Sequence, residues 1–405
     1  MIGRAPVPIL PLVIMFGVMF IDGYDLNAMS LAVPYLLEET GLSRTDFSLV
    51  FSADLVGLGA GALLLAPLGD RIGRRFMIVA TCIGIAIATF GTASASGISG
   101  FAIWRFFTGL ALGGCLPNIS AFSAELAPDT RRAFTMASVS AGIAIGALTA
   151  GLTAPELNAI GGWRLLFYVP AALALLLAVA LFFVLPGERL KKDVALVETR
   201  SRVPLLDLFR PPYVLAFVIF AGIYLVNALA LYMLVRWIPS FLPDAGFSSD
   251  YAVRVTGLMQ GAALPIGIGL SFLIDRWRPG LTFLIAYFCV AGCFLALYLL
   301  PPGPLSWGVF LLLAGGGLAG ANSSLMTLTS YLFPSRMLSS AIGLGVAIAR
   351  GGAIAGPPIG GMLIENGATP AQYFAWMALP MAICGVLSLL IPLALSTRTS
   401  DAVRV

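Results

Sequence analysis

Residues 8–37 read PILPLVIMFGVMFIDGYDLNAMSLAVPYLL, a mostly apolar run that contains the tetrad Asp22-Gly23-Tyr24-Asp25. As an α-helix with a rise of about 1.5 Å per residue, the run is long enough to cross a bilayer core of about 30 Å. Asp22 and Asp25 are three residues apart and share one face of that helix. A charged carboxylate at mid-membrane depth costs at least about 2.5 kcal/mol, so both are expected to face a protein-lined cavity.

Two roles are open for these aspartates. A carboxylate that changes its charge near neutral pH can carry a proton. The chain has no histidine, so proton chemistry falls to carboxylates. The alternative is that both aspartates only hold their helix by hydrogen bonds to neighbouring helices.

The composition is that of a polytopic membrane protein. Of the 405 residues, 59% are hydrophobic and 10% are charged, against about 25% charged residues in a typical soluble protein. The five cysteines have neither metal nor disulfide spacing. There is no phosphate-binding lysine motif, so we predict no enzyme activity, metal or cofactor, and a bilayer rather than nucleic acid as the environment.

The apolar segments number twelve and predict twelve transmembrane helices in an all-α fold. They span about 9–36, 46–68, 76–95, 98–126, 133–155, 164–185, 213–241, 250–274, 280–300, 305–332, 339–364 and 371–395. Of the 23 Lys and Arg, 17 lie at the termini or in the loops that share their side. The positive-inside rule therefore places both termini in the cytoplasm.

The chain divides into two similar halves. A polar stretch at 186–212, predicted to be a cytoplasmic linker, separates a six-helix bundle at 1–185 from a second at 213–405. Asp70-Arg71 after the second segment matches Asp275-Arg276 after the eighth, and Gly142 and Gly146 match a similar pair in the eleventh. Transporters with such repeats bind substrate near mid-membrane, between the halves.

Several motifs resemble those of the major facilitator superfamily. The loop Asp70-Arg71-Ile72-Gly73-Arg74-Arg75 is similar to the family signature between helices 2 and 3, although Ala66 stands where the family has Gly. Arg105-x-x-x-Gly109 is similar to the helix-4 motif. The resemblance covers nearly the whole chain and implies two pseudo-symmetric six-helix bundles.

The tetrad at 22–25 resembles, more narrowly, the Asp-Gly-aromatic-Asp of the aromatic acid:proton symporters. Arg236-Trp237-Ile238-Pro239 and the stretch from Ala349 to Pro357 also fit this family. The resemblance implies that the first-helix aspartates, Arg105 and Arg350 are needed for transport. Asp54 has no counterpart in this pattern, and it is either a further proton site or an interhelical hydrogen-bond partner.

Arg105 and Arg350 keep their charge inside the membrane, so each must face an anion or water. The planar guanidinium matches a carboxylate, and we predict a substrate carboxylate as the partner. The alternative is an internal ion pair, such as Arg105 with Asp22 or Asp25. Further candidates for substrate binding are Tyr24, Tyr224, Asn227, Asn118 and Asn322, the last two of which are predicted to occupy corresponding places in the halves.

A second group of charged residues lies at the predicted cytoplasmic edge. The family resemblance implies a latch that links the halves when this side is closed; plain anchoring of topology by positive charge is the alternative. The residues predicted to take part in gating are Asp70, Arg71, Gly73, Arg74, Arg75, Glu125, Asp275 and Arg276.

The sequence thus predicts a proton-coupled symporter of the inner membrane that works as a monomer and imports a small organic anion, most simply an aromatic carboxylic acid. No cofactor is expected, because the proton gradient supplies the energy. A symporter for a non-aromatic acid or sugar acid, and a drug:proton antiporter of the same fold, are open alternatives. A Gly-Pro element typical of such exporters is absent from the fifth segment at 141–147, which counts against export.

Overall fold

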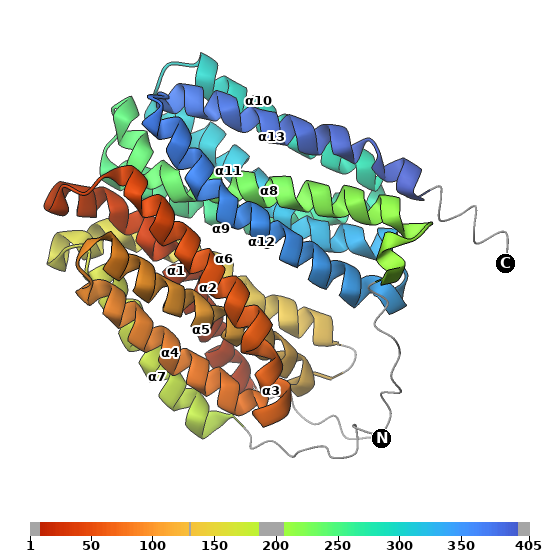
Figure 1. Ribbon diagram of the computed structural model, residues 1–405, viewed down its shortest axis with the longest axis horizontal. Coiled ribbons are helices and arrows are strands. Elements are labelled where there is room, and N and C mark those ends of the chain that lie inside the picture. Colours follow the sequence, from red (N-terminus) through yellow and green to blue (C-terminus); the bar gives the residue numbers. More distant parts are fainter. Residues whose placement is uncertain (1–8, 129–130, 186–205, 396–405) are drawn as a thin grey trace. The chain divides into compact units, whose positions relative to one another are not determined.

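The computed structural model describes residues 9–128, 131–185 and 206–395, and these residues are almost entirely helical (Figure 1). Within these described residues, twelve helical spans are long and apolar enough to cross a membrane, which confirms the twelve-helix prediction. The membrane helices are α1 (Ile9–Thr40), α2 (Phe47–Leu64) continued by α3 (Ala66–Ile72), α4 (Arg74–Ser94), α5 (Gly97–Leu126), α6 (Arg132–Gly161), α7 (Leu165–Val184), α8 (Tyr213–Phe241), α9 (Ser249–Arg276), α10 (Pro279–Leu299), α11 (Pro304–Leu332), α12 (Ser335–Glu365) and α13 (Pro370–Ser388).

Local sequence explains several helix boundaries. Prolines occupy the first turn of α10, α11 and α13, where the missing N–H removes no helical hydrogen bond. The second span is divided at Leu65, and Pro67 lies in the first turn of α3. Gly73 then ends α3 with a φ of 108°, a conformation that side chains with a Cβ rarely adopt. This turn lets α4 begin one residue later.

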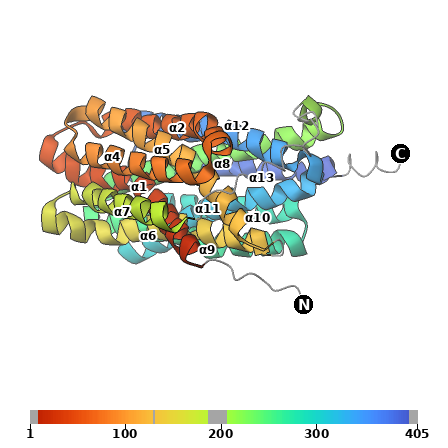
Figure 2. The same ribbon diagram turned by 90° about the horizontal axis from the view of Figure 1, so that it is seen from below.

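The helices fall into two compact units. Unit 1 holds α1–α7 together with Ser249–Gly257 at the start of α9, and unit 2 holds α8, the rest of α9 and α10–α13. Most of the linker predicted at 186–212 lies outside the described residues. Within unit 1 the helices lie lengthwise along one another (Figure 2).

Glycines bring pairs of helices into backbone contact. A Cβ added at Gly57 or Gly61 of α2 would lie 2.1 or 2.0 Å from a carbonyl oxygen of α5. Gly146 of α6 meets the backbone of α1 in the same way, at 1.9 Å. The small-residue spacing seen in the sequence is therefore a packing device, as small residues in membrane helices commonly are.

A glycine-mediated helix contact of unit 1 has a counterpart in unit 2. In unit 2, added Cβ atoms at Gly352 and Gly356 of α12 would lie 2.2 and 2.6 Å from carbonyl oxygens of α8. This matches the packing of α6 on α1 in unit 1. Ser324 of α11 has contacts like those of Asn118 of α5: both side chains donate to the carbonyl four residues earlier and to a carbonyl of a neighbouring helix. The correspondence of Asn118 with Asn322 stays a prediction.

Candidate functional site

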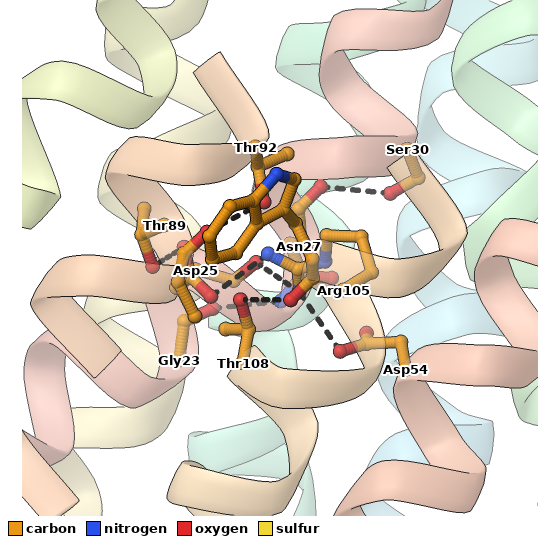
Figure 3. A network of polar contacts seen from close by, with 11 residues as sticks. Gly23, Asp25, Asn27, Ser30, Asp54, Thr89, Thr92, Arg105 and Thr108 are labelled. Atoms are coloured by element: carbon orange, nitrogen blue, oxygen red, sulfur yellow. Dashed lines mark hydrogen bonds and ion pairs between the residues drawn. The ribbon is translucent and has the colours of Figure 1, made fainter. Parts of the chain in front are cut away.

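Arg105 of α5 is the centre of a buried charged cluster in unit 1 (Figure 3). One guanidinium nitrogen donates to Asp25 Oδ2 at 2.9 Å, and the other donates to Asp54 Oδ1 at 3.0 Å. The second nitrogen also donates to the Asp25 backbone carbonyl at 3.0 Å. The side chains of Arg105, Asp25 and Asp54 are 0%, 0% and 2% exposed. The internal ion pair that was the alternative for Arg105 is thus present, with two aspartates as partners.

Close helix packing brings these three side chains together. A Cβ at Gly109, one turn after Arg105, would lie 2.0 Å from the backbone oxygen of Asp54, so only glycine lets α2 approach α5 there. A Cβ added at Gly23, between the two aspartates of α1, would lie only 1.8 Å from the backbone oxygen of Ile143 in α6. These two contacts fix the positions of α2 and α1 and therefore of both carboxylates.

A fourth helix completes the cluster. Thr89 of α4 donates its hydroxyl to Asp25 Oδ1 at 3.0 Å. Asp25 therefore has a donor on each carboxylate oxygen, and both donors hold its orientation. The sequence analysis missed Thr89, because a threonine in an apolar helix carries no distinguishing signal.

The cluster contains one fixed positive charge and two carboxylates. With both carboxylates ionised it carries a net negative charge inside the protein, and one bound proton makes it neutral. Burial of an uncompensated charge is costly, so a net charge on this cluster is costly as well. The geometry is suited to binding and releasing one proton. In the part of the chain that the structure describes, no group of three or more potential ligands is placed to hold a metal ion.

Asp22 and Tyr24 are the other two polar residues of the first-helix tetrad. Asp22, one turn before Asp25, is 5% exposed. Tyr24 points in a different direction and lines a cavity of about 190 Å³ with Thr153 of α6 and Pro170 of α7. The tetrad therefore places Asp25 and Tyr24 against different helices.

Arg350 of α12 has a different environment in unit 2. It is half-buried in a membrane-spanning helix, and within the described residues no carboxylate bonds to its guanidinium. Tyr224 of α8 lies within electrostatic range of it. The two candidate arginines are therefore unequal: Arg105 has its anions within the protein, whereas Arg350 has a charge that a bound anion would balance.

The asparagines of unit 2 form a chain of hydrogen bonds. Tyr287 of α10 donates its hydroxyl to Asn227 Oδ1 at 3.1 Å, and Asn227 Nδ2 donates to Asn322 Oδ1 at 3.0 Å. Asn227 and Tyr287 are fully buried, and Asn322 is half-buried. The structure thus joins the two predicted asparagines and adds Tyr287, which lies in an apolar segment where an aromatic residue is ordinarily a packing residue.

Asn118 is tied to the backbone of unit 1. Its Nδ2 donates to the carbonyl oxygens of Gly114 at 2.8 Å and Ala66 at 3.4 Å, and its side chain packs on Gly69. These contacts join α5 to α3, the short helix that carries Asp70.

Members of the predicted gating group make polar contacts within each unit. In unit 1, Arg74 donates to Asp70 at 2.8 Å and to Glu125 of α5 at 2.6 Å. In unit 2, Tyr331 donates to Asp275 at 2.6 Å. Asp275 is the predicted counterpart of Asp70, so this aspartate bonds to a side chain of a neighbouring helix in both units: to Arg74 of α4 in unit 1 and to Tyr331 of α11 in unit 2.

The remaining members of this group are more exposed or face apolar partners. Arg71 is exposed. Arg75 donates to the carbonyl of Phe182 and lies over its ring, and Arg276 lies over the ring of Phe272.

Arg236 of α8 is a further buried cation that the site prediction omitted. It is 1% exposed and its guanidinium lies 5.7 Å from the ring centre of Tyr232. The sequence signal that could have identified it is the presence of an arginine within a membrane-spanning segment.

Comparisons with known proteins identify a family and several relatives of this chain. The family model described as Major Facilitator Superfamily matches residues 15–351. The 4-hydroxybenzoate transporter PcaK of Pseudomonas aeruginosa is 29% identical over 91% of this chain and 89% of that protein. The 3-(3-hydroxy-phenyl)propionate transporter of Escherichia coli is 29% identical over 92% and 91%, and the gallate transporter of Pseudomonas putida is 28% identical over 91% and 88%.

Solved structures support the fold. A bacterial homologue of the human lysosomal transporter Spinster, in an inward-facing conformation, matches with a TM-score of 0.76 at 17% identity, covering 98% of this chain and 99% of that one. The D-xylose-proton symporter matches with a TM-score of 0.75 at 17% identity, covering 95% and 97%.

Proposed function

This chain belongs to the major facilitator superfamily and is a membrane transporter rather than an enzyme, and on this premise we propose that it imports an aromatic carboxylate together with a proton. The names of its relatives, which include transporters of hydroxybenzoate, gallate and hydroxyphenylpropionate, support the substrate class. The observation that carries the coupling is the buried cluster of Arg105 with two aspartates.

In this proposal the cluster of Asp25, Asp54 and Arg105 is the proton site. The single guanidinium balances one carboxylate, and a proton balances the other. Release of that proton leaves a net negative charge in a buried place, which favours its return unless the surroundings change. Asp22, which is also buried on α1, is a further proposed member of the proton path.

Arg350 is the proposed binding site for the substrate carboxylate. An arginine binds a carboxylate with two parallel hydrogen bonds, and a charge-assisted hydrogen bond contributes about 1.5–3 kcal/mol. Arg105 is less suited to this task, because both of its terminal guanidinium nitrogens already donate to Asp25 and Asp54. The proposed substrate site includes Tyr224, Asn227 and Asn322 and leaves out Asn118, whose amide is bonded to the backbone.

Coupling to a proton solves an energetic problem of uptake. Import of a monoanion against an inside-negative potential costs about 2.3 kcal/mol per 100 mV. One proton per anion makes the transported pair neutral, so that the pH gradient alone drives accumulation. The cluster, with one proton-binding position beyond its arginine, fits this stoichiometry.

The setting of the transporter is part of the proposal. We place it in the cytoplasmic membrane of a bacterium with both termini in the cytoplasm, as the positive charge of the predicted loops favours. It works as a monomer and needs no cofactor, because the proton gradient supplies the energy. The clusters of Arg74 and of Asp275 belong to the proposed gating apparatus at the cytoplasmic edge.

Uptake of radiolabelled hydroxybenzoates into intact cells, with and without a protonophore, tests this function. Saturable uptake that the protonophore abolishes is expected in the parent, and its loss is expected in Asp25→Asn and Arg105→Ala at equal amounts in the membrane. Absence of uptake by well-expressed parent protein would refute the aromatic substrate. Proton-driven uptake by Asp25→Asn at the parental rate would remove Asp25 from the coupling site.

A further inference from the structure

We propose that Asn322 donates a hydrogen bond to a ring hydroxyl of the substrate, and that Tyr287 positions it by way of Asn227. The inference rests on the proposed function and deepens it, because it makes this chain of side chains the device that distinguishes hydroxylated aromatic acids from unsubstituted ones. None of the three residues carries a charge.

The chain of hydrogen bonds has a direction. The Tyr287 hydroxyl donates to Asn227 Oδ1, which leaves Asn227 Nδ2 to donate to Asn322 Oδ1. The carboxamide of Asn322 thereby has its oxygen engaged and its Nδ2 free to donate. Within the described residues no acceptor bonds that nitrogen, and Asn322 is the half-buried member of the chain, within reach of a ligand.

Burial fixes this direction. Asn227 and Tyr287 are 0% exposed, so water does not compete for their polar groups. Buried polar groups are costly when they lack a partner. If the Asn227 amide were turned by 180°, its NH₂ group would donate to the Tyr287 oxygen, and the buried Tyr287 O–H would lose the acceptor that Asn227 Oδ1 provides. The Tyr287 ring is itself held in place by stacking on Phe283, with ring centres 6.0 Å apart.

The anion site lies on the same face of α8. Tyr224, which is within electrostatic range of Arg350, precedes Asn227 by three residues, or about 4.5 Å along the helix axis. A substrate whose carboxylate is held at Arg350 would therefore have its other end near Asn227 and Asn322. All these residues belong to unit 2.

The chemistry of the donor selects a hydroxyl group. A second carboxylate at Asn322 would be an anion without a cation, which is costly in a buried place. A phenolic oxygen accepts the amide N–H without adding charge. A site built to hydrogen-bond a substrate hydroxyl discriminates against the analogue that lacks it, because the protein donor is then left unpaired.

Transport kinetics with matched substrates test the inference. KM would be measured in proteoliposomes for benzoate, 3-hydroxybenzoate and 4-hydroxybenzoate, with Asn322→Leu, which keeps the branched shape of the side chain and removes its polar atoms. Loss of one hydrogen bond is worth about a fivefold change, so KM for at least one hydroxybenzoate should rise about fivefold or more while KM for benzoate stays within about twofold.

Tyr287→Phe is the second variant and tests positioning. It removes only the hydroxyl, and KM for the same hydroxybenzoate should rise about twofold to fivefold with the benzoate value unchanged. Tyr373→Phe is the matched control, because Tyr373 is also buried in unit 2 and donates to the carbonyl of Met233. It should change no ratio of KM values.

The outcomes separate the two proposals. Uptake of all three acids with a KM ratio that Asn322→Leu does not change would overturn the inference and leave the proposed function in place. Equal shifts for all three acids, or the same selective shift in Tyr373→Phe, would also overturn it. Uptake of none of the acids by the parent would overturn the proposed function and the inference together.

Discussion

Replacement of Asp54 by Asn is expected to separate transport from proton coupling. The parent cluster has one arginine and two carboxylates, and it reaches neutrality only with a bound proton. In Asp54→Asn, Arg105 and Asp25 form a neutral pair without any proton. The Arg105 donor that faced the carboxylate can still bond to the amide oxygen of the new side chain. Binding and exchange of substrate should therefore continue, but the proton should no longer be required.

The size of the effect follows from this count of charges. Cotransport of one proton with a monoanion is electroneutral, so accumulation responds to the pH gradient alone. One pH unit is worth about 1.36 kcal/mol, or a tenfold concentration ratio. The parent should reach about a tenfold ratio of inside to outside substrate per pH unit, and Asp54→Asn should stay near a ratio of one.

Proteoliposomes provide the assay. A pH gradient of one unit is imposed while the membrane potential is clamped at zero, and the final substrate ratio is measured for parent and variant. Liposomes without protein give the contribution of passive diffusion of the neutral acid. Counterflow without a gradient shows whether the variant still moves substrate. Asp207→Asn, the same chemical change at a 56% exposed side chain, is the control and should behave as the parent does.

Accumulation by Asp54→Asn to the parental tenfold ratio would refute the reasoning. The second carboxylate of the cluster would then not carry the coupled proton, and Asp22 would be the next residue to test. Loss of counterflow in a variant that is present in normal amounts would equally contradict the idea that the neutral Arg105–Asp25 pair supports exchange.

The other predictions concern binding, packing and gating. Arg350→Ala should raise KM for aromatic monocarboxylates at least about tenfold, because a charge-assisted hydrogen bond of about 1.5–3 kcal/mol is lost, while the accumulation ratio per pH unit at saturating substrate stays as in the parent. Gly57→Ala should destabilise the protein by about 1–3 kcal/mol, seen as a lower Tm in detergent, because the new Cβ would meet an α5 carbonyl at 2.1 Å. Gly59→Ala in the same helix has nothing within 4 Å and should be neutral or stabilising by up to about 1 kcal/mol. Arg74→Glu should lower the turnover rate with little change in Tm, because the ion pair with Glu125 is partly exposed. The double variant with Glu125→Arg restores the pair with its charges exchanged and should recover turnover if this pair acts in gating. A double variant that recovers no turnover would speak against that role.

The sequence defined the helices well, because hydrophobicity and helix length are local properties. All twelve spans were found, with ends that differ mainly by a few residues. Helix α6 extends six residues past its predicted end at 155, to Gly161, because Pro155 is accommodated inside the helix. The second span is divided before Pro67, which removes a backbone donor.

The candidate residues were also found largely from composition, because a charge inside an apolar run is conspicuous. Asp25, Asp54 and Arg105 were all predicted, but which of them bond to one another was left open. The sequence left Arg105 open to Asp22, Asp25 or a substrate, since pairs separated by 80 and 51 residues depend on how each helix is rotated and packed. Close contacts at Gly23 and Gly109 settle that rotation.

What the sequence by itself determined is therefore the membrane fold, the repeat and the set of charged residues that the membrane makes costly. Tertiary structure alone decided which of them neutralise one another. It placed both aspartates on Arg105, left Arg350 without a bonded carboxylate among the described residues, and joined Asn227 to Tyr287. The physical reason is that burial cost is set by the local apolar run, whereas hydrogen bonding requires atoms from different helices to lie within about 3 Å.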